Sequence, residues 1–581
     1  MDFQLITSDY EFKSLLSSVH EKGLVAIDTE TTGLDPLKER IRLIQMAVPG
    51  EPVRIIDTWS ISETIWPKIS QLFSLPVTKI FHNAQFDLKF LSRVGIPVHG
   101  PFFDTMLAYQ VLSTGLKTNG FKLSDLVKNE LGEDLPKELQ VSDFGKEVSR
   151  EQLEYAARDA QVLLRLYPRL TEQLQKYDLQ NTADLEFACL PAVVEMELSG
   201  ILIDTVKWDK LSRKLEEQRV QAIRGLTERI EVGLRRTPGS LFSGDFSAIN
   251  FDSPKQMLEV LQTLGLPVKN TSSDELSPLE EKYPVVRALI DYRKVTKVIQ
   301  SFSNSLPKHI HPLTGRIHPD YWQIGTVTGR FSCKNPNLQQ IPRDQEFREC
   351  FVPAPRHQLV IGDYSQIELR VAAEMTHDPL MTDAFRQGKD IHRLTASLLT
   401  GKRMEEVTKE ERQAAKAVNF GLLYAMGARG LALYAQNSYG VKMTDQQAYE
   451  FRKKFFESYP GISSWQQGLN SSSVQEIRTL NGRLRKWPGK PPLTELLNAP
   501  VQGTAAEIMK QALAWLFPLL QGTSIHIIGT IHDEILLESP ETRVGEAAQI
   551  LKETMIRAGQ KFLSTVPVDA EVVIASNWSE K

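Results

Sequence analysis

Cysteine is scarce in this sequence, with only three in 581 residues. Cys189, Cys333 and Cys350 form no C-x-x-C pair, and an odd number of such widely spaced cysteines does not build a disulfide framework or a zinc ribbon. A reducing compartment fits this composition best. The chain also lacks a charged-then-apolar start and any run of about 18 uncharged apolar residues, so we expect neither secretion nor a membrane span.

An excess of basic residues is also missing. The 68 Lys and Arg residues stand against 72 Asp and Glu residues, which gives a formal net charge of −4. A chain without a basic excess can bind a polyanion only where its cations cluster locally. At 581 residues the chain also exceeds what one hydrophobic core usually holds, so we expect at least two domains.

The order of hydrophobic patterns divides the chain. Up to about residue 170, short apolar strands alternate with helical patterns, which is typical of an α/β domain. Long helical stretches follow over residues 184–231, then a Gly-, Ser- and Pro-rich loop over residues 235–254. From about residue 301, strands and helices are mixed. We therefore expect two domains, the second of them subdivided.

The stretch LVAIDTETTGLDP places two carboxylates, Asp28 and Glu30, directly after an apolar run. A buried strand that ends in this way can deliver both side chains to a divalent cation at the open edge of a sheet. Asp87 lies at the start of a predicted helix, and Tyr155 and Asp159 lie one helical turn apart. Each motif alone is common at ordinary strand ends, where carboxylates are simply solvated.

Four such carboxylates together can bind two divalent cations, which activate a water and stabilise a leaving 3′ oxygen during phosphodiester hydrolysis. In order and residue type, the three motifs resemble those of the DEDD exonucleases in their tyrosine-containing subclass. The resemblance covers residues 1 to about 175 and implies a ribonuclease H-like α/β domain with 3′–5′ exonuclease activity. It implies metal ligands at Asp28, Glu30, Asp87 and Asp159, with Tyr155 orienting the water.

A second set of carboxylates lies far along the chain. Asp363 ends the apolar strand of LVIGDYSQIELR, and IHIIGTIHDEILLE places Asp533 and Glu534 between two apolar strands, where a hairpin turn is expected. If these strands are neighbours, Asp363 and Asp533 converge on a metal pair. Each pattern alone is common in ordinary proteins.

Between these motifs, Thr408 and Glu411 form a capping box that predicts the start of a helix. Two cations and two aromatic residues then recur every four residues along one face. These four residues are Arg412, Lys416, Phe420 and Tyr424. Cations suit a triphosphate and aromatic rings suit a base or a sugar, so the stripe indicates a nucleotide-binding face. A partly solvated amphipathic helix is the plainer alternative.

From about residue 186 onward the chain resembles family A DNA polymerases of the DNA polymerase I type. DYSQIELR is similar to motif A of that family, RQAAKAVNFGLLY to motif B and HDE to motif C. Further similar stretches are GTVTGRFSCKNPNLQQIP, NAPVQGTAAEIMK and VVEMELSGILID. The resemblance implies an α+β right-hand polymerase domain over residues 176–581. Its thumb and the start of its palm are expected over about 190–310, its fingers over about 375–500, and the rest of the palm in the remainder.

The resemblance also implies roles for individual residues. Asp363 and Asp533 are expected to hold the metal, with Glu534 and Lys416 in the catalytic group. Glu368 is expected to block a 2′-hydroxyl. The expected nucleotide contacts are Arg412, Lys416, Phe420, Tyr424, Glu368, Gln366 and His392. The expected DNA contacts are Arg330, Asn335, Gln339, Arg370, Asn498, Gln502, His532, Arg293 and Lys297.

The chain departs from the family pattern at two points, and one domain is expected to be absent. Ala425 stands where the family usually has glycine, and the segment PLTELLNAP lacks the arginine often found shortly before Asn498. No segment precedes the exonuclease motifs, so we expect no 5′-nuclease domain. The loop over residues 235–254 resembles the tip of the thumb and is expected to contact duplex backbone.

The leading hypothesis is a proofreading, DNA-templated DNA polymerase. It would use two Mg²⁺ ions per active site, with Mn²⁺ as a substitute, and bind primer–template DNA and dNTPs. The alternatives are an exonuclease with an inert extension, a non-enzymatic DNA-binding protein and a single-subunit RNA polymerase. We expect a monomer in the cytoplasm of a bacterium or of a virus-infected cell, with an organelle as the alternative location. The sequence identifies no helicase or processivity factor.

Overall fold

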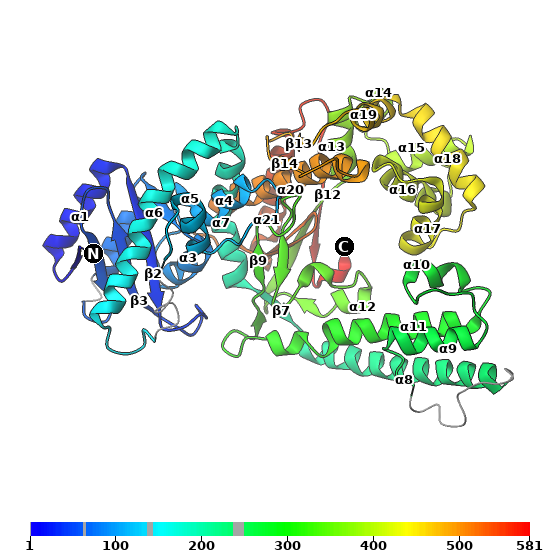
Figure 1. The fold of residues 1–581 in the computed structure, drawn as a ribbon, viewed down its shortest axis with the longest axis horizontal. Helices are drawn as coiled ribbons and strands as arrows, with labels where there is room; N and C mark the ends of the chain where they lie inside the picture. Colours follow the sequence, from blue (N-terminus) through cyan, green and yellow to red (C-terminus); the bar gives the residue numbers. More distant parts are fainter. Residues whose placement is uncertain (1, 62–64, 136–142, 236–248) are drawn as a thin grey trace.

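The computed structural model describes residues 2–61, 65–135, 143–235 and 249–581. Figure 1 shows an α/β body formed by the N-terminal part, joined to a larger body in which three groups of elements surround a central opening. The predicted loop over residues 235–254 lies largely outside the described residues, because 236–248 are not described. Among the described residues, no helix combines the length and the apolar composition that crossing a bilayer requires.

A six-stranded mixed sheet forms the centre of the N-terminal body, in the order β1-β4-β3-β2-β5-β6. Val25, Ala26 and Ile27 of β2 are fully buried in the middle of this sheet, as the apolar run predicts. The pairing of β2 with β3 is antiparallel and that with β5 is parallel. The strands are β1 (Phe3–Leu5), β2 (Leu24–Thr31), β3 (Ile41–Ala47), β4 (Val53–Asp57), β5 (Thr78–Phe81) and β6 (Phe102–Asp104).

Helices cover this sheet, and the long helix α6 packs across β2, β3, β4 and β5. Leu163, Leu166, Leu170 and Leu174 recur at helical spacing on its buried face, and Ser149 starts it with a capping box. The helices of this body are α1 (Asp9–Lys22), α2 (Ile65–Ser74), α3 (Ala84–Arg93), α4 (Thr105–Leu112), α5 (Leu123–Leu131) and α6 (Arg150–Lys176).

The second body is built around a four-stranded antiparallel sheet in the order β15-β16-β12-β17, which we call the palm sheet. Its strands are β12 (His357–Tyr364), β15 (His526–Ile531), β16 (Glu534–Pro540) and β17 (Ala570–Ala575). Four helices support this region: α7 (Gln180–Ser199), α13 (Ile367–Thr376), α20 (Leu493–Leu520) and α21 (Val544–Gln560). A three-stranded sheet of β7 (Ile201–Ile203), β8 (Arg316–Ile317) and β11 (Phe351–Val352) lies beside them.

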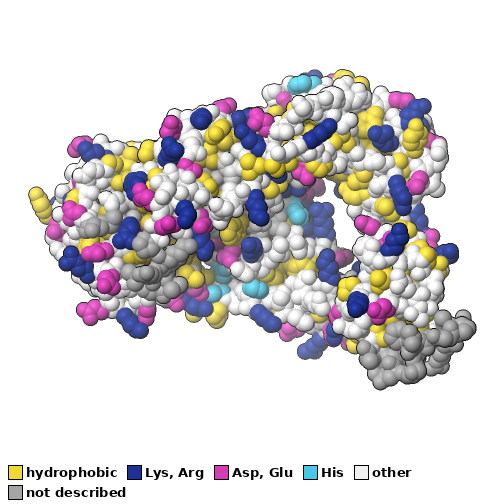
Figure 2. Space-filling view, viewed as in Figure 1, with side chains coloured by type: hydrophobic (Ala, Val, Ile, Leu, Met, Phe, Trp, Pro, Cys, Tyr) yellow, Lys and Arg dark blue, Asp and Glu magenta, His cyan; other side chains and the backbone are white. Residues whose placement is uncertain are grey.

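Two further groups of helices complete the second body (Figure 1). The thumb helices α8 (Thr205–Arg235), α9 (Pro254–Thr263) and α11 (Pro284–Val298) have their own small hydrophobic core. The region expected to form the fingers, about residues 375–500, contains α14 (Pro379–Arg386), α15 (Ile391–Thr400), α16 (Lys409–Leu423), α17 (Ala428–Tyr439), α18 (Asp445–Ser458) and α19 (Pro460–Ser471). Fingers and thumb meet through an exposed ion pair between Lys442 and Glu281. Figure 2 shows the hollow between them, with Lys and Arg side chains on its palm wall.

Buried polar contacts join the two bodies. Glu197 of α7 accepts from Lys89 of α3 at 2.7 Å and from the backbone N–H of Tyr321 at 2.5 Å. Gln85 of α3 also donates to Glu197. Because Glu197 is almost completely buried, losing Lys89 would leave a desolvated carboxylate with too little compensation. This ion pair therefore holds α3, which carries Asp87, against the second body.

Candidate active sites

The N-terminal carboxylates come together across β2, α3 and α6. Burial is the main cause that raises the pKa of Asp28. The charges of Asp87, Glu30 and Asp159 raise it further, so these three carboxylates lie close to Asp28. Within the described part of the chain, no lysine or arginine forms an ion pair with any of the four. The structure thus brings the three motifs together, and Arg158 acts on Asp159 only at longer range, partly offsetting the rise in the pKa of that carboxyl.

Burial and mutual repulsion disturb the ionisation of this group. They raise the pKa of Glu30 to about 8, and burial raises that of Asp87 to about 7 and that of Asp159 to about 6. The Thr29 hydroxyl donates to Asp87 at 2.6 Å and lowers the pKa in part. Tyr155 donates to Asp159, and burial together with this contact raises the pKa of its phenol, which therefore stays protonated.

The palm carboxylates also converge, because β12 pairs directly with β16. Asp363 lies opposite Glu534 in this register, and the backbone N–H of Tyr364 donates to the Asp533 carbonyl at 3.3 Å. The hairpin turn between β15 and β16 consists of His532 and Asp533. Glu534 is therefore the first residue of β16, which corrects its expected place between the strands. His532 has a φ of 56°, the left-handed conformation that tight hairpin turns require.

The electrostatics of the palm site differ from those of the first site. Burial and the Asp533 charge raise the pKa of Asp363 to about 7, although Lys581 acts in the opposite direction. Burial also raises the pKa of Asp533. Burial would raise the pKa of Glu534 too, but Lys581 and Arg348 hold it below its usual value. Lys581 and Arg348 belong to no motif of the sequence, and neither was predicted from it.

Both sites have donor groups that suit a divalent cation. Asp363 has a buried Oδ1 atom with no hydrogen-bond partner, and the first site holds four carboxylates, of which Asp87 is buried and Asp28, Glu30 and Asp159 are half-buried. Such oxygen-rich, negatively charged groups are the ligands that Mg²⁺ prefers. Among the described residues, no group of three or more His, Cys, Asp or Glu side chains already has the geometry to hold an ion. The donor chemistry fits a metal that would draw the carboxylates together.

Helix α16 faces the palm site, and Thr408 and Glu411 form its predicted capping box. Burial lowers the pKa of Lys416, with the charges of Arg343 and Arg412 adding to the effect. Arg412 donates a hydrogen bond of 2.8 Å to Asp390, and Asp390 is the N-cap residue of α15. Lys416 also lies within electrostatic reach of Asp363 and Asp533. Arg343 adds a third cation that the sequence pattern did not predict.

The aromatic part of the stripe meets the residues expected to select the sugar. Tyr424 donates to Glu368 Oε2 at 2.6 Å, and Arg330 pairs with Glu368 Oε1. Phe420 lies 5.9 Å from His392 between ring centroids. His392 is buried and bonded to Asn419 at 2.9 Å, and burial lowers its pKa to about 4. The imidazole is therefore neutral at pH 7.

The remaining predicted contacts fall into two groups. Gln339, Asn498, Gln502, His532 and Lys297 are half-buried or exposed, and Gln339 receives a hydrogen bond from the His532 N–H at 3.3 Å. Gln366 and Asn335 both have left-handed backbone, with φ of 60° and 51°. These roles stay predictions.

Arg370 and Arg293 are used within the protein. Arg370 is buried over Phe385 and donates to the Ser365 carbonyl at 2.7 Å, while Arg293 donates to the Thr271 hydroxyl at 3.0 Å. This geometry favours structural roles for both arginines over the predicted DNA contacts.

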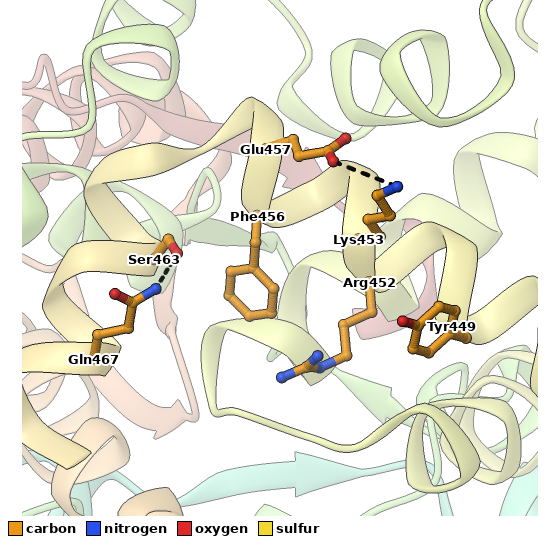
Figure 3. A pocket seen from close by; sticks show the side chains of 7 residues that line it. All are labelled: Tyr449, Arg452, Lys453, Phe456, Glu457, Ser463 and Gln467. Carbon is orange, nitrogen blue, oxygen red and sulfur yellow. Dashed lines mark hydrogen bonds and ion pairs between the residues drawn. The ribbon is translucent and has the colours of Figure 1, made fainter. Parts of the chain in front are cut away.

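A hollow of about 430 Å³ opens on the fingers, between α18 and α19 (Figure 3). Its lining residues are Tyr449, Arg452, Lys453, Phe456, Glu457, Ser463 and Gln467. Figure 3 shows Lys453 directed toward Glu457, and Gln467 donates to Ser463 at 3.1 Å. None of the predicted site residues lines this hollow, so it belongs to neither carboxylate site.

Comparisons with known proteins identify the family of each part of the chain. The family model described as DNA polymerase family A matches residues 223–580, and the model described as 3′-5′ exonuclease matches residues 3–175. DNA polymerase I of Aquifex aeolicus is 34% identical, with all of both chains covered. DNA polymerase I of Pseudomonas aeruginosa is 30% identical over all of this chain and 66% of its own length.

A solved structure has the same overall arrangement. It is described as the POL domain of Pol1 from M. smegmatis in complex with DNA primer-template and dNTP. It aligns with a TM-score of 0.82 and 25% identity over 99% of each chain. The chain belongs to DNA polymerase family A and carries a 3′–5′ exonuclease domain before its polymerase domain.

Proposed function

We infer that this chain copies DNA from a primer–template and removes misincorporated nucleotides from the 3′ end, with two separate metal-dependent sites. The observation that supports this most strongly is the presence of two distinct carboxylate groups, one on β2, α3 and α6 and one on β12 and the β15–β16 hairpin. Polymerases and exonucleases of these families generally depend on divalent metals. Mg²⁺ is the proposed ion, with Mn²⁺ as a substitute.

In the polymerase site, Asp363 and Asp533 would hold the metal, which lowers the charge cost of attack by the 3′ oxygen and of pyrophosphate release when it is bound. Arg412 and Lys416 offer charge-assisted hydrogen bonds to the triphosphate. To bind the nucleotide, Arg412 exchanges its contact with Asp390 for one with phosphate. Lys416, with its lowered pKa, is suited to give a proton to the leaving pyrophosphate.

The residues around Glu368 are proposed to select the sugar. Arg330 and Tyr424 fix both oxygens of this carboxylate, so it cannot turn away from an incoming ribose. A fixed carboxylate at C2′ leaves no room for a hydroxyl group and disfavours the RNA polymerase alternative. Phe420 is proposed to pack against the 3′ side of the sugar.

In the exonuclease site, the protonated Tyr155 phenol is proposed to orient the attacking water. Its hydrogen bond to Asp159, one helical turn along α6, fixes the phenol beside this proposed metal ligand. The four carboxylates would hold the divalent ions that activate this water and stabilise the leaving 3′ oxygen when bound.

The binding partners and the cellular location are proposed from the relatives of this chain. Primer–template DNA and dNTPs are the proposed partners, since the M. smegmatis polymerase of similar fold was solved in complex with both. A location in the bacterial cytoplasm is proposed because the relatives described above are bacterial. A monomer is proposed as the form of the protein.

One primer-extension assay separates the alternatives. The protein is incubated with a labelled primer–template and Mg²⁺, with dNTPs, with rNTPs or without nucleotide. Extension with dNTPs alone, together with primer shortening in the absence of nucleotide, supports the proposal. Efficient extension with rNTPs would support an RNA polymerase, shortening without extension an exonuclease alone, and binding without either reaction a non-enzymatic protein.

A further inference from the structure

Lys581 lies in the palm site, although it belongs to none of the motifs of the sequence. Its Nζ atom is 2.5 Å from Asp363 Oδ2 and 2.7 Å from Glu534 Oε1. Only 17% of its side chain is exposed. Figure 1 places this end of the chain next to the palm sheet. The ammonium group therefore bridges two carboxylates from neighbouring strands.

A rigid anchor delivers Lys581 to this position. Trp578 is fully buried, and its indole N–H donates to Glu534 Oε2 at 3.0 Å. The guanidinium of Arg348 stacks 4.4 Å from the Trp578 ring centroid and donates to Glu534 Oε1 at 3.3 Å. Glu534 is thus bound by three donors, and we expect it to act as a positioning residue for this anchor.

Asp363 is in a different situation from Glu534. Among the described residues, Lys581 is the only cation that forms an ion pair with Asp363. The Oδ2 atom bonds Lys581, while the buried Oδ1 atom has no hydrogen-bond partner. One oxygen of the proposed metal ligand is therefore free, and the other is occupied by an ammonium group.

The exonuclease site is balanced differently: Arg158 lowers the pKa of Asp159 through its charge but, within the described residues, forms no ion pair with it. None of its four carboxylates forms an ion pair with lysine or arginine within the described residues. The two sites of one chain thus differ in how their charge is balanced before a metal binds. A divalent ion entering the palm site must compete with Lys581 for Asp363, since two cations so close together repel each other strongly.

We propose that Lys581 is an internal counter-cation of the polymerase site, which the metal must displace from Asp363 and which thereby weakens metal binding at this site alone. The proposal rests on the proposed role of Asp363 as a metal ligand. It predicts that the polymerase site requires a higher concentration of divalent metal than it would without Lys581.

The test measures binding of Mn²⁺ alone, without DNA or nucleotide, by electron paramagnetic resonance. All proteins carry Asp28→Ala and Glu30→Ala to weaken metal binding at the other site. Lys581→Met removes the charge, and Lys581→Arg keeps it. Lys552→Met, at an exposed position on α21, is the matched control. We expect Lys581→Met to bind Mn²⁺ about three- to tenfold more tightly, with Lys581→Arg and Lys552→Met near the parent value.

Unchanged or weaker Mn²⁺ binding by Lys581→Met would overturn the proposal. Asp363→Ala in the same background separates the two assumptions. If this change lowers Mn²⁺ binding while Lys581→Met has no effect, only the counter-cation role fails. If Asp363→Ala leaves binding unchanged, the metal-ligand assignment fails as well.

A second measurement keeps the test decisive if Lys581→Met is less stable than the parent protein. The rise in unfolding temperature on adding Mn²⁺ should be larger for Lys581→Met than for the parent protein, because tighter binding to the folded state stabilises it more. A rise equal to or smaller than that of the parent would contradict the proposal, even if the metal-free variant is less stable.

Discussion

Tyr424 and Arg330 both bond the Glu368 carboxylate, one at each oxygen. Glu368→Ala removes the acceptor of both Tyr424 and Arg330 and opens space at C2′. Incorporation of rNTP relative to dNTP should rise about tenfold or more, while dNTP insertion slows because Tyr424 loses its partner. Phe420→Tyr should instead change the ratio of ddNTP to dNTP.

Single-nucleotide insertion kinetics with dNTP, rNTP and ddNTP measure both ratios. Glu541→Ala, at an exposed palm position, is the control and should change neither ratio. If neither Glu368→Ala nor Phe420→Tyr changes its own ratio, these residues do not line the sugar pocket.

Ala425 has a φ of 58°, so an alanine occupies the left-handed conformation in which the family usually has glycine. A Cβ atom in this conformation costs roughly 1 kcal/mol, which glycine avoids. Ala425→Gly should therefore strengthen hydrogen-exchange protection at the junction of α16 and α17. Ala414→Gly, within the regular helix α16, should weaken protection there by about 1 kcal/mol. Equal losses of hydrogen-exchange protection in Ala425→Gly and Ala414→Gly would contradict this account.

At the scale of elements, the convergence of β2, α3 and α6 predicts a link between pH and stability. The pKa values of Glu30 and Asp87 are raised to about 8 and about 7 in the folded state, so that state holds protons that the unfolded chain releases. Their contribution to stability is complete below the ordinary carboxyl pKa values and is lost as the pH rises to about 8. Bound Mg²⁺ would offset the repulsion.

The rise in unfolding temperature of the exonuclease domain on adding Mg²⁺ should therefore be larger at pH about 8 than at pH about 5.5. Differential scanning calorimetry with EDTA or Mg²⁺ measures this rise. Glu30→Gln with Asp87→Asn should flatten the pH dependence in EDTA. The same slope in the double variant would show that other groups cause it.

The elements also show which features can be predicted from sequence. Periodicity and capping predict β2, α6 and α16, and Asp363 and Asp533 converge because their apolar strands share one sheet. These are local patterns with a fixed spatial consequence. The contact of Lys581 with Asp363 spans 218 residues, and no local pattern encodes it. The inward bonds of Arg370 and the left-handed φ of Ala425 likewise depend on tertiary packing.

At the scale of the whole molecule, DNA binding must succeed despite a net charge of −4. Affinity for primer–template should fall steeply with salt, because binding releases counterions from the phosphates that local cations contact. Lys297 is an exposed cation on the thumb helix α11. Lys297→Ala should reduce the slope of log affinity against log salt by about one, whereas Lys552→Ala should not. Fluorescence anisotropy across a salt series measures the slope for the parent protein, Lys297→Ala and Lys552→Ala. Equal slopes for these three proteins would show that Lys297 does not contact the DNA.

The central claim is that synthesis and proofreading use two independent carboxylate sites. Its most direct test follows two labelled primer–templates, one matched and one mismatched, with Mg²⁺ and dNTPs. Asp533→Ala should shorten the primer without extending it. Asp28→Ala with Glu30→Ala should stop shortening and still extend a matched primer. Normal extension by Asp533→Ala, continued shortening by the double variant, or loss of both activities in either protein would contradict the account.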